Sequence, residues 1–362
     1  MEQNLNSTKT LSERNLSLDV LKILSMVMVI ILHTKTYGLQ GVSLENSTGI
    51  YWLTQSLHIF SLVAVNCFVL ISGYFTSTSK IRPIKLIKLW TLVTTFSLGI
   101  YLLLCAIPSN SFELSFGEIL VSIFPVMANR YWFFTCYIVM MVLSPFINKF
   151  IDSLDKATYQ KLLAVLLVLF VGINSLNFWG DSLGTGKGYS VLWFIVLYLV
   201  AAHIRRYGLP KLPYGILHVA ISIFSTLTFT LLKLGGKYFE ICEQASEILL
   251  RYNSATVFWA SVCLFLFFLN HPIKPTKISQ RLICDVSGAS FGVYLLHEHP
   301  LLRDILWNNI VRLQGTTNSV GSYLVRMLIS IVVIFVAGVI SGWLVMSIIN
   351  LLEKLIRKIL KK

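Results

Sequence analysis

The chain has 362 residues, of which 56% are hydrophobic and only 13% are charged. A soluble domain carries about a quarter charged residues, so this composition excludes an ordinary soluble protein and predicts a polytopic membrane protein. The formal net charge is +14. The basic residues are scattered between apolar runs, which excludes the concentrated basic face of a nucleic-acid-binding protein. We therefore expect an all-α transmembrane helix bundle.

Apolar segments long enough to cross about 30 Å of hydrocarbon recur along the chain. We expect ten spans, at residues 16–37, 55–75, 86–107, 131–150, 160–178, 189–204, 214–233, 255–271, 285–302 and 323–350. A shorter segment at 112–128, which Pro125 ends, is expected to be interfacial or re-entrant. The domain organisation is then a cytoplasmic N-terminal segment (1–15), a membrane domain (16–350) and a basic amphipathic cytoplasmic tail (351–362), which is expected on anionic membrane lipid.

The distribution of Lys and Arg indicates an orientation. If residues 1–15 lie inside, twenty of the thirty basic residues fall in inner connections and nine in outer ones, with Lys22 inside the first span. The positive-inside rule favours this arrangement, which places both termini in the cytoplasm. The nine outer basic residues are Lys35, Arg130, Lys187, Lys233, Lys237, Arg251, Arg303, Arg312 and Arg326.

The first span carries Asp19, Lys22 and His33 in a segment that otherwise suits lipid. A charge at the centre of a membrane helix costs about 2.5–3.5 kcal/mol on insertion scales, and such residues are usually functional. Lys22 and His33 are eleven residues apart, about three helical turns, so both project from nearly the same face about 16 Å apart. A histidine is suited to take a proton from a hydroxyl group at neutral pH.

These residues also have plainer interpretations. His33 would be unremarkable as a histidine that hydrogen-bonds a carbonyl group at a helix end. Asp19 and Lys22 have the spacing of an i,i+3 ion pair, which lowers the cost of insertion. The ion pair is compatible with function, since the carboxylate can hold the ammonium group toward a phosphate.

Two further motifs fall on the expected cytoplasmic side. Lys85 and Lys88 recur one turn apart at the start of the third span, which suits polyphosphate binding or simply reflects the positive-inside rule. The second span ends in Ser-Gly-Tyr, where Gly73 permits close approach of another backbone, and Tyr74 is a candidate binding residue. The alternative for this motif is ordinary small-residue helix packing.

Two motifs fall toward the expected outer side. Trp132 belongs to an aromatic group that is typical of an interfacial belt, and it is also a candidate to line an acceptor site. His297 and Glu298 end the ninth span, where they are candidates to orient His33 or to contact a substrate; exposure at the interface is the alternative.

We expect neither a metal site nor a permanently bound cofactor. The sequence His297-Glu298-His299 lacks the spacing of H-E-x-x-H, and adjacent helical residues face different directions. The six cysteines show no metal-binding spacing either.

Taken in order, these motifs resemble the acyltransferase 3 family of integral-membrane acyltransferases, over roughly residues 14–350. The motifs are Lys22-x10-His33 after an LDxLK element, LISGYF at 70–75, the basic pair Lys85-x-x-Lys88, YWF…SPFIN at 131–148, and SFGVYLLHEHP at 290–300. The family typically has Arg or Lys, ten residues and then His in the first motif, and R-x-x-R in the third.

The resemblance implies an O-acetyltransferase of a bacterial plasma membrane. An acyl group, often acetyl, would pass from cytoplasmic acyl-CoA to a hydroxyl of a surface or capsular polysaccharide or its lipid-linked precursor. His33 would be catalytic, and Lys22, Lys85 and Lys88 would bind the donor. Lysine in place of arginine loses bidentate phosphate geometry. The remaining alternatives are a glycan exporter and a non-catalytic component of a glycan-synthesis complex.

Overall fold

The computed structural model describes residues 15–40, 48–79, 82–107, 112–178, 180–181 and 183–359. Within these ranges every regular element is helical, which confirms the all-α expectation. Seven helical segments of this described part are long and apolar enough to cross a membrane, so the chain is a multi-pass membrane protein. They are Leu16–Thr36, Thr48–Thr76, Pro83–Ala106, Trp132–Asp152, Lys156–Leu176, Tyr214–Gly235 and Val320–Lys358.

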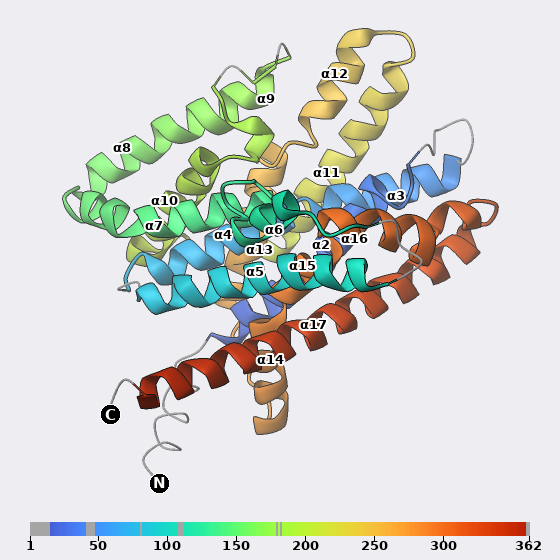
Figure 1. Ribbon diagram of the computed structural model, residues 1–362. Helices are drawn as coiled ribbons and strands as arrows, with labels where there is room; N and C mark the ends of the chain where they lie inside the picture. Colours follow the sequence, from blue (N-terminus) through green and yellow to red (C-terminus); the bar gives the residue numbers. More distant parts are fainter. Residues whose placement is uncertain are drawn as a thin grey trace.

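The helices form one bundle, with α17 along one edge (Figure 1). They are α2 (Leu16–Thr36), α3 (Thr48–Ser61), α4 (Val63–Thr76), α5 (Pro83–Ala106), α6 (Phe116–Ile123), α7 (Trp132–Asp152), α8 (Lys156–Leu167), α9 (Asn174–Leu176), α10 (Val191–Tyr207), α11 (Tyr214–Gly235), α12 (Glu240–Ile248), α13 (Ala255–Asn270), α14 (Lys277–Ala289), α15 (Phe291–His297), α16 (Pro300–Asp304) and α17 (Val320–Ile359). Short π-helices lie at Val168–Ile173 and Ile305–Val311, and 3-10 turns at Gly186–Gly188 and Leu313–Thr316.

Helix α4 is the centre of the bundle and packs against α2, α10 and α13. Ten of its fourteen residues are buried, including the polar Asn66. The Asn66 amide donates to Tyr252 O and Ser261 Oγ, and its Oδ1 accepts from Trp193 Nε1. A buried amide is tolerated when its polar atoms are partnered, so these bonds hold α4, α10 and α13 in one register.

Helix α15 lies unusually close to α17 because glycines face each other across the contact. A Cβ atom on Gly292 would lie 2.5 Å from Cα of Gly342, and one on Gly338 would lie 2.4 Å from Cα of Val293. Small residues let helix backbones approach in this way within membranes. The short α15 is therefore set directly against the longest helix of the chain.

The structure differs from the expected spans in three places. Helices α10 and α13 lie at the sixth and eighth expected spans, but with 17 and 16 residues they are shorter than the seven spanning segments. The ninth is broken into α14, which ends at Ala289, α15, which ends at His297, and α16. The extended backbone of His299, just before Pro300, separates α15 from α16. Helix α17 begins at the tenth expected span and continues through residues 351–359 of the expected tail. Residues 1–14 and 360–362, which belong to the expected terminal segments, lie outside the described residues.

The segment 112–128 forms only the eight-residue helix α6, whose residues are half-buried or exposed except for the buried Ser122. It is too short to span hydrocarbon. It is tied to the bundle by an ion pair between Glu118 and Arg130.

Candidate active site

His33 lies in the last turn of α2. At the other end of this helix, the side chain of Asn15 caps the first turn by accepting a hydrogen bond from Leu18 N. The His33 side chain is only 14% exposed. It lies between a broad polar cavity and a narrow apolar slot, and it lines both of them.

Both ring nitrogens of His33 face side chains from the end of α15. Its Nδ1 lies 2.8 Å from Nε2 of His297. The other nitrogen of His297, Nδ1, lies 2.5 Å from the carbonyl oxygen of Val293. A carbonyl oxygen only accepts, so His297 Nδ1 carries the proton and His297 Nε2 accepts when the ring is neutral. His33 Nδ1 must then donate, which leaves the lone pair of a neutral His33 on Nε2.

Glu298 approaches the free nitrogen of His33. Its Oε1 lies 3.5 Å from His33 Nε2. The Tyr37 hydroxyl lies within hydrogen-bonding reach of the Glu298 carboxylate and accepts from Arg303 Nη1 at 3.1 Å. The Arg303 guanidinium also covers the Tyr37 ring, 4.5 Å from its centroid. The carboxylate is thus oriented by its neighbours while it faces the catalytic candidate.

The break in the ninth expected span explains how two adjacent residues reach one ring. Within a continuous helix, His297 and Glu298 would point in different directions. Helix α15 ends at His297, Glu298 is its C-cap, and His299 caps the next helix before Pro300. The turn allows His297 and Glu298 to approach opposite nitrogens of His33. Both are buried, so the alternative of interface exposure is wrong.

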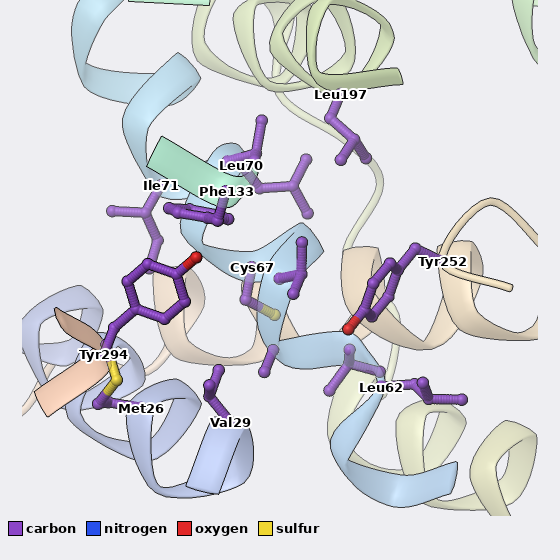
Figure 2. Packing of buried hydrophobic residues seen from close by; sticks show 14 of the residues in the cluster. Met26, Val29, Leu62, Cys67, Leu70, Ile71, Phe133, Leu197, Tyr252 and Tyr294 are labelled. Carbon is purple, nitrogen blue, oxygen red and sulfur yellow. The ribbon is translucent and has the colours of Figure 1, made fainter. Parts of the chain in front are cut away.

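The apolar slot lies beside α2 between Lys22 and His33. It has a volume of about 30 Å³ and an almost entirely apolar or aromatic lining. Figure 2 shows Met26 and Val29 of α2 on one side, with Tyr294, Phe133 and Tyr252 around the same space. Such a slot suits a small apolar group and excludes a bulky one.

The polar cavity on the other side of His33 is far larger, about 750 Å³. Trp132 and Tyr252 line both spaces. The Trp132 ring is stacked on Tyr252, with centroids 6.0 Å apart, and contacts Tyr189 at 4.4 Å. The aromatic group that the sequence assigned to an interfacial belt therefore also forms a wall of this cavity.

The other candidate residues lie away from the His33 cluster. Lys22 Nζ is 3.6 Å from Asp19 Oδ1, as the i,i+3 spacing predicts, and Asp19 Oδ1 also accepts from Ser287 Oγ. Tyr74 lies about 14 Å along α4 from Val65, which lines the slot. Its hydroxyl accepts from Arg205 Nη1 at 3.0 Å.

The two lysines at the start of α5 differ in their surroundings. Lys85 is exposed. Lys88 Nζ donates to Asn350 Oδ1 at 2.7 Å and lies 2.5 Å from Glu353 Oε2, so the far end of α17 holds it.

Sequence reasoning missed Tyr37 and Arg303, which orient Glu298. One signal was present: Tyr37 follows His33 by four residues, so both lie on one helix face. Arg303 has no such signal, because it reaches the cluster only after the turn at Pro300. Among the described residues, no group of three or more His, Cys, Asp or Glu is arranged to hold a metal ion.

Comparison with models of protein families matches the acyltransferase 3 model, an acyltransferase domain, over residues 15–347. Neither the search of curated proteins nor the search of solved structures finds a match.

Proposed function

Because the chain belongs to the acyltransferase 3 family of membrane-bound acyltransferases, we propose that it moves an acetyl group from acetyl-CoA to a hydroxyl of a polysaccharide or its lipid-linked precursor. The donor would bind on the cytoplasmic side of a bacterial plasma membrane and the acceptor on the outer side. The bias of basic residues supports this orientation, with the Lys22 end of α2 inside and the His33 end outside.

The tautomer of His33, which the contact with His297 sets, is the observation on which the proposal rests. With His297 accepting from Nδ1, the lone pair of His33 Nε2 is available to a hydroxyl in the polar cavity. His33 would take the hydroxyl proton as the oxygen bonds to the thioester carbonyl carbon. The carbon–sulfur bond then breaks, and the proton passes from His33 to the leaving CoA thiolate.

Glu298 suits the charge that develops during this reaction. His33 becomes an imidazolium when it takes the proton, and a carboxylate 3.5 Å from Nε2 stabilises that cation. The same carboxylate does not need to accept the proton itself.

The slot suits the acyl group. A space of about 30 Å³ lined by Met26, Val29 and aromatic rings favours a methyl group over a long acyl chain. Its position between Lys22 and His33 would place the thioester beside the histidine while the CoA extends inward. Lys22, held by Asp19, together with Lys85 and Lys88, would attract the CoA phosphates.

The test is release of free CoA by purified protein that receives acetyl-CoA and a glycan acceptor. His33→Ala should remove a rate advantage of about 10²–10⁴-fold, the usual contribution of general acid–base catalysis. His271→Ala, an exposed histidine at the end of α13, is the matched control and should retain activity. An exporter or scaffold would release no CoA, and retained activity in His33→Ala would reject the assignment of the base.

In cells, mass spectrometry of surface glycans should show loss of acetyl groups when the protein is removed. The His33→Ala variant should reproduce that loss while still inserting into the membrane.

A further inference from the structure

Five basic side chains line the polar cavity beside His33. They are Lys35, Arg130, Lys187, Arg251 and Arg303. All five belong to the nine basic residues that the charge count places on the outer side. Outer connections of membrane proteins are poor in basic residues. The concentration of most of them in one cavity is therefore not explained by topology.

Acidic neighbours neutralise only part of this charge. Arg130 forms an ion pair with Glu118. Two acidic side chains line the cavity, Glu247 and Glu298. Glu247 Oε1 lies 3.9 Å from Nζ of Lys233, which shares its charge, and Glu298 faces His33. Without Arg130, four cationic side chains and two carboxylates line the cavity, and each carboxylate also lies near another basic or titratable group. The cavity lining therefore carries more positive than negative charge.

Arg251, one of the residues that line this cavity, has one side-chain donor without a partner. The residue is 8% exposed, and its Nη1 donates to the carbonyl oxygens of Asn174 and Asn177 at 3.0 and 3.3 Å. Its Nε is buried without a hydrogen-bond partner among the described residues. Arg303 Nε is in the same condition. A buried donor without a partner is unfavourable, and an anionic ligand would satisfy it.

We propose that the acceptor carries a carboxylate or phosphate group close to the hydroxyl that is acylated, and that Lys35, Lys187 and Arg251 bind this anion. This proposal rests on the proposed function, because it assigns the polar cavity to the acceptor. Trp132 and Tyr252 offer aromatic faces for the sugar ring at the same cavity, so the charge and the ring would be recognised together.

Binding tests the proposal separately from transfer. The probes are an oligogalacturonate, the same oligosaccharide after reduction of its carboxyl groups, and glucose 1-phosphate compared with glucose. They are added to the purified full chain carrying His33→Ala, which keeps the cavity but not the base. We expect the anionic member of at least one pair to bind about tenfold or more tightly, as expected for charge-assisted hydrogen bonds. The pair that responds identifies carboxylate or phosphate as the source.

Variants identify the residues. Lys35→Gln and Lys187→Gln should each weaken anion binding several-fold and leave binding of the neutral partner unchanged. Lys237→Gln is the matched control, because Lys237 is an exposed outer lysine that does not line the cavity. Lys35 and Lys187 are preferred to Arg251, whose bonds to backbone carbonyls also support the fold.

The outcomes separate the two proposals. Equal binding of charged and neutral probes, or loss of binding in Lys237→Gln as large as in Lys35→Gln, would overturn the anionic acceptor. Absence of CoA release from the unmodified chain with every acceptor would overturn the transferase mechanism, whatever the probes show in binding.

Discussion

The two ends of α2 hold their polar groups in different ways. At one end, both nitrogens of His33 face buried partners, His297 and Glu298, at 2.8 and 3.5 Å. At the other end, Lys22 is one third exposed and lies 3.6 Å from Asp19. A group that transfers a proton requires a defined tautomer, whereas lysines that attract phosphate groups need only charge and reach. The rigid end therefore suits the chemistry and the open end suits a flexible polyphosphate donor.

Among the variants that test this difference, His297→Phe should have the largest effect on activity. It removes the acceptor of the His33 Nδ1 proton, so the ring no longer favours a lone pair on Nε2. We expect kcat to fall by about 10²–10⁴-fold, as when a histidine loses the group that sets its tautomer. The measurement is CoA release.

His218→Phe is the control for that variant. His218 is also buried and lies 3.0 Å from a backbone carbonyl, that of Ala260, but it does not line the cavities at His33. If both variants lose the same activity, His297 has a structural role only.

A second test, Glu298→Gln, removes charge and keeps shape. We expect kcat to fall roughly ten- to a hundredfold, because a buried carboxylate no longer stabilises the imidazolium. Binding of acetyl-CoA should not change, since Glu298 lines the polar cavity that we propose for the acceptor. An unchanged kcat would show that the imidazolium forms without this carboxylate.

The sequence predicts some residues of this cluster better than others. His33 is evident because a polar group in an apolar span is costly, and the helices are evident from their long apolar runs. The sequence names His297 and Glu298 as candidates to orient His33. That both reach the same ring is not evident, because it depends on a turn before Pro300 within a segment that resembles a single span. Lys88 illustrates the opposite case: the sequence shows its charge, but only the fold shows that Lys88 forms an ion pair with Glu353.

A third test enlarges the slot between the two ends. Val29→Ala removes two methyl groups from its wall. We expect the rate with butyryl-CoA relative to acetyl-CoA to rise about tenfold, since a methylene in an apolar pocket is worth about that factor. Val257→Ala is the control, because Val257 is equally buried on α13 and does not line the slot. A similar change in both variants would place the acyl group elsewhere.

The smallest effect is expected at the basic pair of α5, Lys85 and Lys88, which we propose to attract the donor. Glu353→Gln removes the carboxylate that lies against Lys88 and should free the ammonium group for the donor. We expect KM for acetyl-CoA to fall by a factor of about two to five, the range of an exposed ion pair. Lys85→Gln should raise KM by a similar factor. A KM that responds to neither variant would remove this basic pair from the donor site.

The glycine contact between α15 and α17 makes the enzyme vulnerable where it has no chemistry. His297 lies at the end of a seven-residue helix whose position is set by Gly292 against Gly342. Any larger side chain at these glycines must displace α15, and His33 would lose its proton acceptor without being touched. A genetic screen for inactive alleles would therefore recover substitutions of the glycines between α15 and α17 as well as substitutions of the histidines.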